Sequence, residues 1–301
     1  MEEEIDLLNE QFSIEGEIGF SEQEGDLVYI DVINKYAEAT ISLYGAHIIQ
    51  YNPYNTVDVL WMSPASNFEQ GKAIRGGIPI CFPWFGPHAT DANLPAHGFA
   101  RILPWNVTKT ESSPKGETLI TLELNSSEET LKYWPYSFKA ELDISVGPQL
   151  KVELRITNTG QESFEYTSAI HTYFTISQIS NIKIEGLQGA SYYSGFGKDI
   201  FTQESEFIEI EKEENRRYVN TDSEIILHDP VFRRKIKTSK QGSKVTVVWN
   251  PWSETVKTMS DIPEDGYETF VCIEPANSYD DFVKLAPGEK HSTIGVIGLL
   301  V

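Results

Sequence analysis

The chain has 301 residues, of which 40% are hydrophobic and 23% charged, a composition that is ordinary for a globular protein able to bury a large core. Its 45 acidic and 24 basic residues give a formal net charge of −21, which opposes binding to nucleic acid and to anionic membranes. Cys81 and Cys272 are too few for a disulfide scaffold, and we expect buried, reduced thiols.

The N-terminal residues MEEEIDLLNEQF predict a short helix. Their acidic charge is unlike the basic start of a signal peptide, and no apolar run in the chain is long enough to span a membrane. We therefore expect a cytoplasmic protein with neither nucleic acid nor a membrane as a partner.

Most of the remaining chain has the pattern of β-strands. Apolar and polar residues alternate through 138–146, so one face of that strand is buried, and VGPQL at 146–150 predicts a hairpin turn. Strands are predicted at 27–33, 39–44, 118–124, 138–146, 149–157, 244–249 and 269–274. Because no repeat or linker divides them, we expect one all-β domain over residues 1–301, a large antiparallel β-sandwich with a few short helices.

The segment 75–105 is the least regular part of the sequence. Gly76 and Gly77 permit a backbone that other residues cannot adopt, and several prolines restrict the chain around them. A rigid, irregular loop that carries charged groups suits a preorganised binding site, although a loop packed over the sandwich with solvated arginines has the same pattern. The polar side chains that it carries are Arg75, His88, His97 and Arg101.

Two further segments have local signals. Ser126 and Glu129 have the spacing of a capping box, which predicts a short helix that Pro135 ends. The charged, turn-rich segment at 195–220 is expected to be an exposed loop rather than a domain boundary.

Candidate polar and aromatic side chains follow in the C-terminal half. His171 lies in the apolar run SAIHTYFTI, where a histidine is either a core residue or a functional one. Asp222 and Asp229 are either turn formers or ligands. Trp249 and Trp252 either stack on a sugar face or fill the core.

Glu274 in TFVCIEPAN precedes Pro275 and is therefore expected at a strand end. A carboxylate there either faces solvent or lies in a cleft, where desolvation raises its pKa and suits it to act as a base. The sequence contains no HExxH, CxxC, glycine-rich phosphate loop or GxSxG motif, and DIPEDG at 261–266 is expected to form a surface turn rather than a cation site.

The string RGGIPICFPWFG at 75–86, followed by HGFAR at 97–101 and then Trp105, strongly resembles the glucose-6-phosphate 1-epimerase (hexose-6-phosphate mutarotase) branch of the aldose 1-epimerase family. WMSPASNF before this string, and LKYWPYSF, IHTYF, VVWNP and DGYETFVCIEPA after it, fall in the family's order, so the resemblance covers most of the chain. It implies a galactose mutarotase-like β-sandwich, called a supersandwich, with an open cleft on one sheet. It also implies a monomer that needs no cofactor or metal.

The resemblance further implies residue roles. His171 matches the family's catalytic acid and Glu274 its catalytic base. His97 matches a histidine that contacts the sugar, and Asp222 matches an aspartate that binds sugar hydroxyls.

The phosphate-specific branch also has arginines that hold the phosphate of the substrate, and Arg75 and Arg101 match them. Such a local cluster would overcome the net negative charge at short range. Ala96 departs from the glutamine that often precedes this histidine in relatives, which puts one polar contact in doubt.

The implied reaction is the interconversion of the α and β anomers of glucose 6-phosphate, or of another aldohexose 6-phosphate, by ring opening. Glu274 takes the proton of the anomeric hydroxyl while His171, as imidazolium, donates a proton to the ring oxygen. Two alternatives stay open: the same reaction on an unphosphorylated aldose, and a non-catalytic carbohydrate-binding sandwich.

Overall fold

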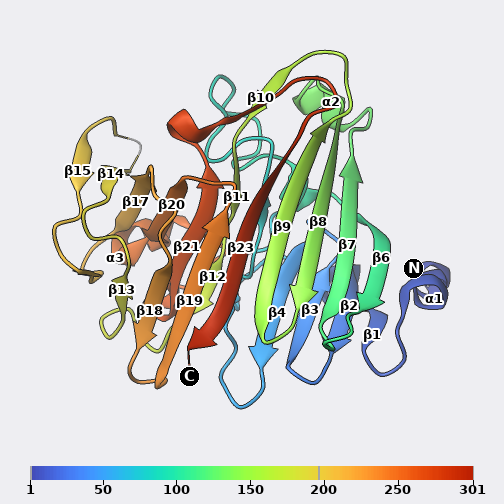
Figure 1. Cartoon of the computed structure of the whole chain (residues 1–301), viewed down its shortest axis with the longest axis horizontal. Coiled ribbons are helices and arrows are strands. Elements are labelled where there is room, and N and C mark those ends of the chain that lie inside the picture. Colours follow the sequence, from blue (N-terminus) through green and yellow to red (C-terminus); the bar gives the residue numbers. More distant parts are fainter. Residues whose placement is uncertain (1, 196, 301) are drawn as a thin grey trace.

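The computed structural model describes residues 2–195 and 197–300, and stacked antiparallel β-sheets make up most of it (Figure 1). The largest sheet has nine strands in the order β16-β13-β18-β19-β23-β9-β8-β7-β6. In chain order these strands are β6 (Asn106–Ser112), β7 (Thr118–Asn125), β8 (Phe138–Val146), β9 (Gln149–Asn158), β13 (Lys183–Glu185), β16 (Phe207–Ile208), β18 (Ile225–Asp229), β19 (Arg234–Gln241) and β23 (Lys290–Leu300).

A second sheet has eight strands, in the order β15-β14-β17-β20-β21-β11-β5, with β12 also paired to β21. These strands are β5 (Ile80–Cys81), β11 (Ser168–Ile170), β12 (Tyr173–Thr175), β14 (Ser191–Ser194), β15 (Ile200–Thr202), β17 (Glu214–Val219), β20 (Val245–Asn250) and β21 (Phe270–Asn277). A four-stranded sheet and a two-stranded sheet complete the fold. Their strands are β1 (Ile18–Glu22), β2 (Val28–Ile33), β3 (Ala37–Ser42), β4 (His47–Pro53), β10 (Phe164–Tyr166) and β22 (Val283–Leu285).

Each strand predicted from alternation or β-branched residues is confirmed within a few residues. The hairpin is confirmed as well, because β8 and β9 pair from Phe138↔Asn158 to Val146↔Leu150. Every second residue of β8 is buried, as its sequence pattern predicts. Both cysteines are free and buried, as expected.

The helices are short. They are α1 (Glu2–Phe12), α2 (Thr130–Tyr133) and α3 (Trp252–Thr255), and 3₁₀ turns lie at Glu24–Asp26, Ala100–Ile102, Val256–Thr258, Gly266–Thr269 and Tyr279–Asp281. The helix predicted after Ser126 is α2, but its N-cap is Glu129, which makes no side-chain capping bond, and the Thr130 N–H donates to Ser127 Oγ at 3.3 Å. In the part of the chain that the structure describes, no helix has the length and apolar character needed to cross a membrane.

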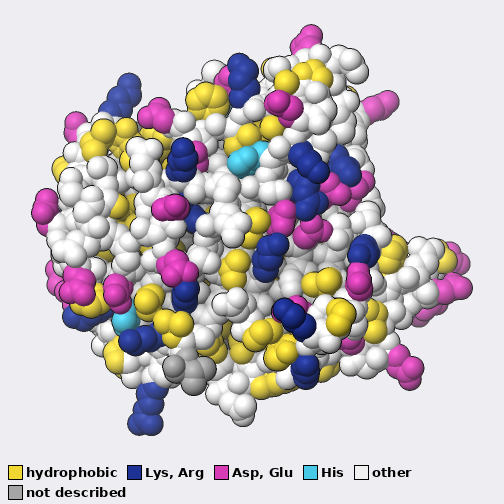
Figure 2. Space-filling model, viewed as in Figure 1, with side chains coloured by type: hydrophobic (Ala, Val, Ile, Leu, Met, Phe, Trp, Pro, Cys, Tyr) yellow, Lys and Arg dark blue, Asp and Glu magenta, His cyan; other side chains and the backbone are white. Residues whose placement is uncertain are grey.

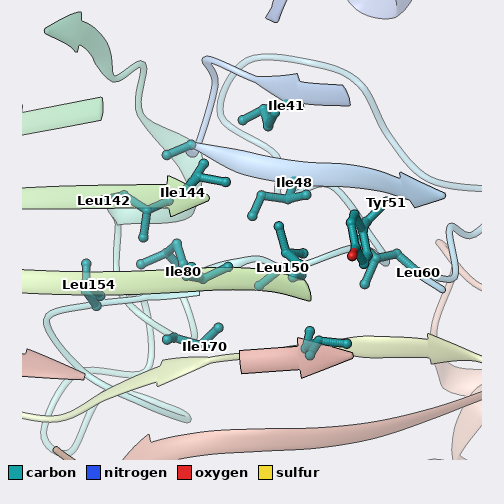
Figure 3. Packing of buried hydrophobic residues seen from close by; sticks show 14 of the residues in the cluster. Ile41, Ile48, Tyr51, Leu60, Ile80, Leu142, Ile144, Leu150, Leu154 and Ile170 are labelled. Carbon is teal, nitrogen blue, oxygen red and sulfur yellow. The ribbon is translucent and has the colours of Figure 1, made fainter. Parts of the chain in front are cut away.

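The hydrophobic core lies between the nine-stranded sheet and the two sheets behind it (Figure 1). Figure 3 shows Leu142 and Ile144 of β8 near Ile41 and Ile48 of the four-stranded sheet, with Ile80 and Ile170 of the eight-stranded sheet close by. Each such side chain contributes about 1.5–3 kcal/mol by its removal from water. The sheets therefore stack as a sandwich, as the sequence predicts.

The segment 195–220 differs from the expected loop. It contains β15, β16 and β17, and β17 is an internal strand between β14 and β20. Its charged side chains pair within the sheet: Arg216 lies 2.7 Å from Glu214 and donates to Gln203 Oε1 at 2.8 Å. The charged composition of the segment suggested an exposed loop. Composition alone does not show that these charges are neutralised by neighbouring side chains in a sheet.

The two faces of the eight-stranded sheet have different environments. On β21, Pro275 faces the nine-stranded sheet, where an added Cβ on Gly295 of β23 would lie 3.4 Å from Pro275 Cγ. Because successive side chains of a strand point to opposite faces, Glu274 must face away from the nine-stranded sheet. The open face of the sheet therefore carries the residue predicted to act as a base.

Candidate active site

A cavity of about 620 Å³ lies on the open face of the eight-stranded sheet. It is lined by five of the six residues that the sequence analysis assigned to a site: Arg75, His97, Arg101, His171 and Glu274. The structure therefore brings together side chains that are as far apart in sequence as Arg75 and Glu274.

Strand register builds the floor of this cavity. Arg217 of β17 is opposite Val247 of β20, and Val247 is opposite Glu274 of β21. Opposed residues in paired strands share a face, so the three side chains form a row across the sheet. Trp249 is two residues from Val247 and lies on the same face, where it also lines the cavity.

Glu274 lies inside a strand rather than at its end, which corrects the expectation drawn from Pro275. The neighbouring strand is interrupted instead: β11 ends at Ile170, β12 begins at Tyr173, and His171 lies between them. The Ile273 N–H donates to Thr172 O at 3.3 Å, so the nitrogen of Pro275, two residues on, faces the same edge. Proline has no N–H to donate, and it is tolerated because the ladder is broken at that point.

The interruption places His171 directly beside Glu274. Nδ1 of His171 lies 3.5 Å from Oε1 of Glu274, and their side chains are only 7% and 1% exposed. The Tyr173 ring stacks on the imidazole at 4.8 Å. His171 Nδ1 and Glu274 Oε2 have no hydrogen-bond partner, which is unusual for buried polar atoms and typical of functional groups.

Burial shifts the pKa values of these two groups in opposite directions. It lowers the pKa of His171 well below 6.5, and the positive charges of Arg101 and Arg75 lower it further. Burial raises the pKa of Glu274 well above 4.5, although the Arg217 cation opposes this. Burial therefore acts against the charged form of each group, and so against the imidazolium expected from the sequence.

Arg75 is held in place by an acidic partner. Its Nε donates to Asp261 Oδ2 at 3.0 Å, and its Nη1 donates to the Tyr173 hydroxyl at 2.9 Å. Asp261 belongs to the DIPEDG segment, which was expected to be only a surface turn. Its side chain is 18% exposed, so this part of the segment is a support of the cavity.

Arg101 is held by a backbone carbonyl. Its Nη2 donates to Ala96 O at 2.8 Å, and its Nε has no hydrogen-bond partner. The contact uses the main chain of Ala96, so the departure from glutamine at this position does not remove it. Arg101 therefore offers an unpaired buried donor at the cavity.

His97 has a defined tautomer. The Gly86 N–H donates to His97 Nδ1 at 3.3 Å, so the ring proton lies on Nε2. Burial lowers its pKa well below 6.5, with Arg101 adding to the effect. The ring centroids of His97 and His171 are 5.5 Å apart, which places a neutral donor next to the pair.

Other predicted candidates lie elsewhere. Asp222 is exposed and is not among the residues that line the cavity. Asp229 is buried and accepts hydrogen bonds from the Ser177 and Phe232 N–H groups at 2.7 and 3.0 Å, which is the turn-forming role. His88 and Trp252 also lie outside the lining, so of the two tryptophans only Trp249 is placed to stack on a ligand.

Arg217 and Tyr279 line the cavity but were not found by sequence reasoning. Arg217 belongs to the segment interpreted as a loop. Its signal was the alternation of Asn215, Arg217 and Val219 with Glu214, Arg216 and Tyr218, which has the period of a strand.

One group of side chains in the described residues has the donor atoms for a metal ion. Those of His171, Cys272 and Glu274 lie within 4.8 Å of one another. Cys272 is fully buried, and burial raises the pKa of its thiol, which opposes the thiolate that a metal binds. The same imidazole and carboxyl group are the ones placed for proton transfer.

Known proteins resemble the whole of this architecture. The family model described as aldose 1-epimerase matches residues 29–297. A relative from Salmonella typhimurium named "Putative glucose-6-phosphate 1-epimerase" is 36% identical over 274 residues, which are 90% of each chain. One from Escherichia coli K12 with the same name is 36% identical over 255 residues, which are 84% of this chain and 83% of the relative.

The fold matches solved structures as well. The crystal structure of a "putative mutarotase (YeaD)" from Salmonella typhimurium has a TM-score of 0.88 and 31% identity, covering 96% of this chain and 95% of that one. A galactose mutarotase-like protein from Clostridium acetobutylicum has a TM-score of 0.74 at 16% identity over 94% of this chain and 98% of that one, a likeness of fold.

Proposed function

The chain belongs to the aldose 1-epimerase family, and on that premise we propose that it is a hexose-6-phosphate mutarotase, which interconverts the α and β anomers of glucose 6-phosphate. The observation that carries the proposal is the contact of 3.5 Å between His171 Nδ1 and Glu274 Oε1 in a cavity that Arg75, Arg101 and Arg217 also line. An acid, a base and an anion-binding group are what this reaction requires.

Mutarotation needs three events. The proton of the anomeric hydroxyl O1 leaves, the ring oxygen O5 gains a proton, and the C1–O5 bond breaks to give the open aldehyde. After rotation about C1–C2, the same transfers in reverse close the ring on either face. The reaction moves no electrons to a carrier, so two positioned proton-transfer groups are sufficient.

We propose that His171 and Glu274 pass protons to each other directly. The O1 proton goes to Glu274 Oε2, the proton on Oε1 goes to His171 Nδ1, and the proton on His171 Nε2 goes to O5. Every transfer keeps both side chains neutral, which agrees with the opposite pKa shifts that burial causes. The gap between Nδ1 and Oε1 would close in the substrate complex, as catalytic contacts commonly do.

Arg75 and Arg101 are proposed to bind the phosphate. A guanidinium forms paired, charge-assisted hydrogen bonds with phosphate oxygens. Arg101 has an unpaired buried Nε at the cavity, and the bond of Arg75 to Asp261 holds its guanidinium in a fixed orientation. A module that only binds carbohydrate has no use for a buried acid–base pair, so the geometry favours an enzyme.

The catalytic pair is tested by following anomer exchange of glucose 6-phosphate by NMR. His171→Asn and Glu274→Gln should each reduce kcat at least about 100-fold, the usual contribution of one acid–base group. Near-normal kcat in either folded variant would reject the assignment. The matched control is His88→Asn, which changes a histidine outside the cavity lining and should retain full activity.

The phosphate role is tested by comparing glucose 6-phosphate with glucose. Arg101→Ala should raise KM for glucose 6-phosphate roughly tenfold or more, because a charge-assisted hydrogen bond is lost. KM for glucose should change little. An equal loss on both sugars would mean that Arg101 is structural and would favour an unphosphorylated substrate.

We also propose that the protein acts as a cytoplasmic monomer on a small-molecule phosphosugar, with neither nucleic acid nor a membrane as a partner. The net charge of −21 supports the exclusion of polyanionic partners. The proposed chemistry needs no second subunit, because every residue assigned to it comes from one chain. Size measurement in solution tests the monomer.

A further inference from the structure

The charged groups of the cavity have an order across the eight-stranded sheet. Arg217 of β17 lies two strands from Glu274 of β21, with Val247 of β20 between them. His171 follows β11, on the other side of Glu274. Beyond His171, Arg75 reaches the Tyr173 hydroxyl and Arg101 reaches Ala96 O. The order is therefore Arg217, Glu274, His171, and then the arginine pair.

A hexopyranose 6-phosphate has a matching order of groups. Its 2-hydroxyl is on C2, which is bonded to C1, and C1 carries O1. C1 is bonded to O5, and C5, C6 and the phosphate follow. When Glu274 is at O1 and His171 at O5, the phosphate extends toward Arg75 and Arg101. The C2 side of the ring then faces Arg217.

We propose that Arg217 forms a binding subsite for the 2-hydroxyl group of the sugar. The proposal rests on the proposed mutarotase function and assigns a specificity-determining residue to it. Arg217 is 7% exposed and lines the cavity, and its guanidinium has several N–H donors in a planar fork. It can therefore donate to a hydroxyl in addition to its protein partners.

The guanidinium of Arg217 is held in a fixed position, as a specificity group must be. Nη1 donates to the Tyr279 hydroxyl and Nη2 donates to Gly195 O. Its Cζ lies 4.9 Å from the centroid of the Tyr279 ring, and the Tyr193 ring stacks on the Tyr279 ring with the two centroids 4.8 Å apart. Contacts to two separate segments, at Gly195 and at Tyr279, keep the charge at this wall of the cavity.

A fixed cation at this point selects substrates by charge at C2. A hydroxyl accepts a hydrogen bond from it, whereas a 2-deoxy sugar offers no partner. A protonated 2-amino-2-deoxy sugar phosphate brings an ammonium group against the guanidinium and is repelled. The natural substrate is therefore a hexose 6-phosphate with an oxygen at C2.

The test changes the residue and the 2-hydroxyl group of the substrate separately and together, in the manner of a double-mutant cycle. The measured quantity is kcat/KM for anomer exchange by NMR. Wild-type protein and Arg217→Met are compared on glucose 6-phosphate and 2-deoxyglucose 6-phosphate. Because the Arg217 cation also acts on the pKa of Glu274, the diagnostic quantity is the difference between substrates: Arg217→Met should lower kcat/KM for glucose 6-phosphate about tenfold or more beyond its effect on the 2-deoxy sugar. The control Arg216→Met, on the opposite face of β17, should affect neither substrate selectively.

The wild-type substrates give a second measurement that does not depend on folding of the variant. Wild-type protein should prefer glucose 6-phosphate over both the 2-deoxy sugar and glucosamine 6-phosphate, the latter at a pH where its amine is protonated. Equal rates on all three substrates would overturn the subsite while leaving the mutarotase function intact. A variant that loses only its preference for phosphorylated over free glucose would overturn it as well, since Arg217 would then face the phosphate. If no hexose 6-phosphate is a substrate, the proposed function itself fails.

Discussion

His47 is a buried imidazole that supports the loop of the cavity. Its Nε2 donates to Gly76 O at 2.7 Å, next to Arg75, and the side chain is fully buried. Burial lowers the pKa of His47 from 6.5 to about 4. The residue therefore contributes to stability only while it is neutral.

The pH dependence of stability follows from this shift. Between pH 6.5 and about 4 the unfolded chain binds a proton at this residue and the folded protein does not, so stability falls as pH falls through that window. At pH 5 the loss from this residue is about 2 kcal/mol relative to neutral pH. Above pH 6.5 the contribution is constant.

His47→Gln keeps a donor for Gly76 O but cannot titrate. The free energy of unfolding should fall between pH 7 and pH 5 in both proteins. We expect the fall to be about 2 kcal/mol smaller in the variant than in the parent. Urea denaturation at both pH values measures this. Because burial lowers the pKa of His97 and His171 too, only the difference between variant and parent is diagnostic. Parallel pH profiles would contradict the account of His47.

At the scale of elements, the catalytic geometry depends on breaks in regular structure. The interruption between β11 and β12 places His171 beside Glu274, and the loop before β5 places Arg75. That loop needs its paired glycines: Gly76 and Gly77 have φ of +108° and +59°. A Cβ on Gly77 would lie 2.3 Å from Ile48 O, which leaves no room for a side chain.

Gly77→Ala should therefore destabilise the protein by about 2 kcal/mol or more and reduce activity by moving Arg75. The matched control is Gly71→Ala, where φ is also positive, at +82°, but an added Cβ meets no atom within 4 Å. That variant should cost only the roughly 1–2 kcal/mol of a left-handed residue. Thermal unfolding and mutarotase rate measure both. Equal effects would show that the contact with Ile48 O is unimportant.

At the scale of the whole molecule, a strongly acidic protein must bind an anionic substrate. Figure 2 shows acidic and basic side chains interspersed over one face, and pairs such as Arg155–Asp143 at 2.9 Å neutralise part of that surface. The net charge of −21 still repels a phosphate at long range. The arginines proposed to bind the phosphate would act on it only at short range, within that repulsive field.

Added salt should distinguish the long-range repulsion by the net charge from the short-range contacts with the arginines. Raising ionic strength from about 10 to 100 mM shortens the Debye length from roughly 30 to 10 Å, which screens the whole-molecule field before it screens direct contacts. We expect kcat/KM for glucose 6-phosphate to rise over this range, by less than about tenfold, and that for glucose to stay constant. A fall for the phosphorylated sugar would mean that attraction by the arginines dominates at long range too.

Features that depend on neighbours along the chain could be predicted from the amino-acid sequence. Alternation identified the strands, because side chains two residues apart share a face. The paired glycines predicted an unusual backbone, because only glycine tolerates its dihedral angles and close contacts. The motif resemblance identified the family, and five of the six residues to which it assigned roles line one cavity.

Features that depend on pairing between distant strands could be seen only in the folded molecule. Glu274 was expected at a strand end, but its own strand β21 is continuous and the neighbouring strand is interrupted between β11 and β12. The residues around Pro275 do not indicate where a neighbouring strand ends. Asp222 matches a family motif, but its side chain is exposed and is not among the residues that line the cavity. Arg217 was placed in a loop because its segment is charged, and only the register of β17, β20 and β21 puts it in one row with Val247 and Glu274. Strand register is set by the packing of whole sheets, so it is not encoded in any one segment of the chain.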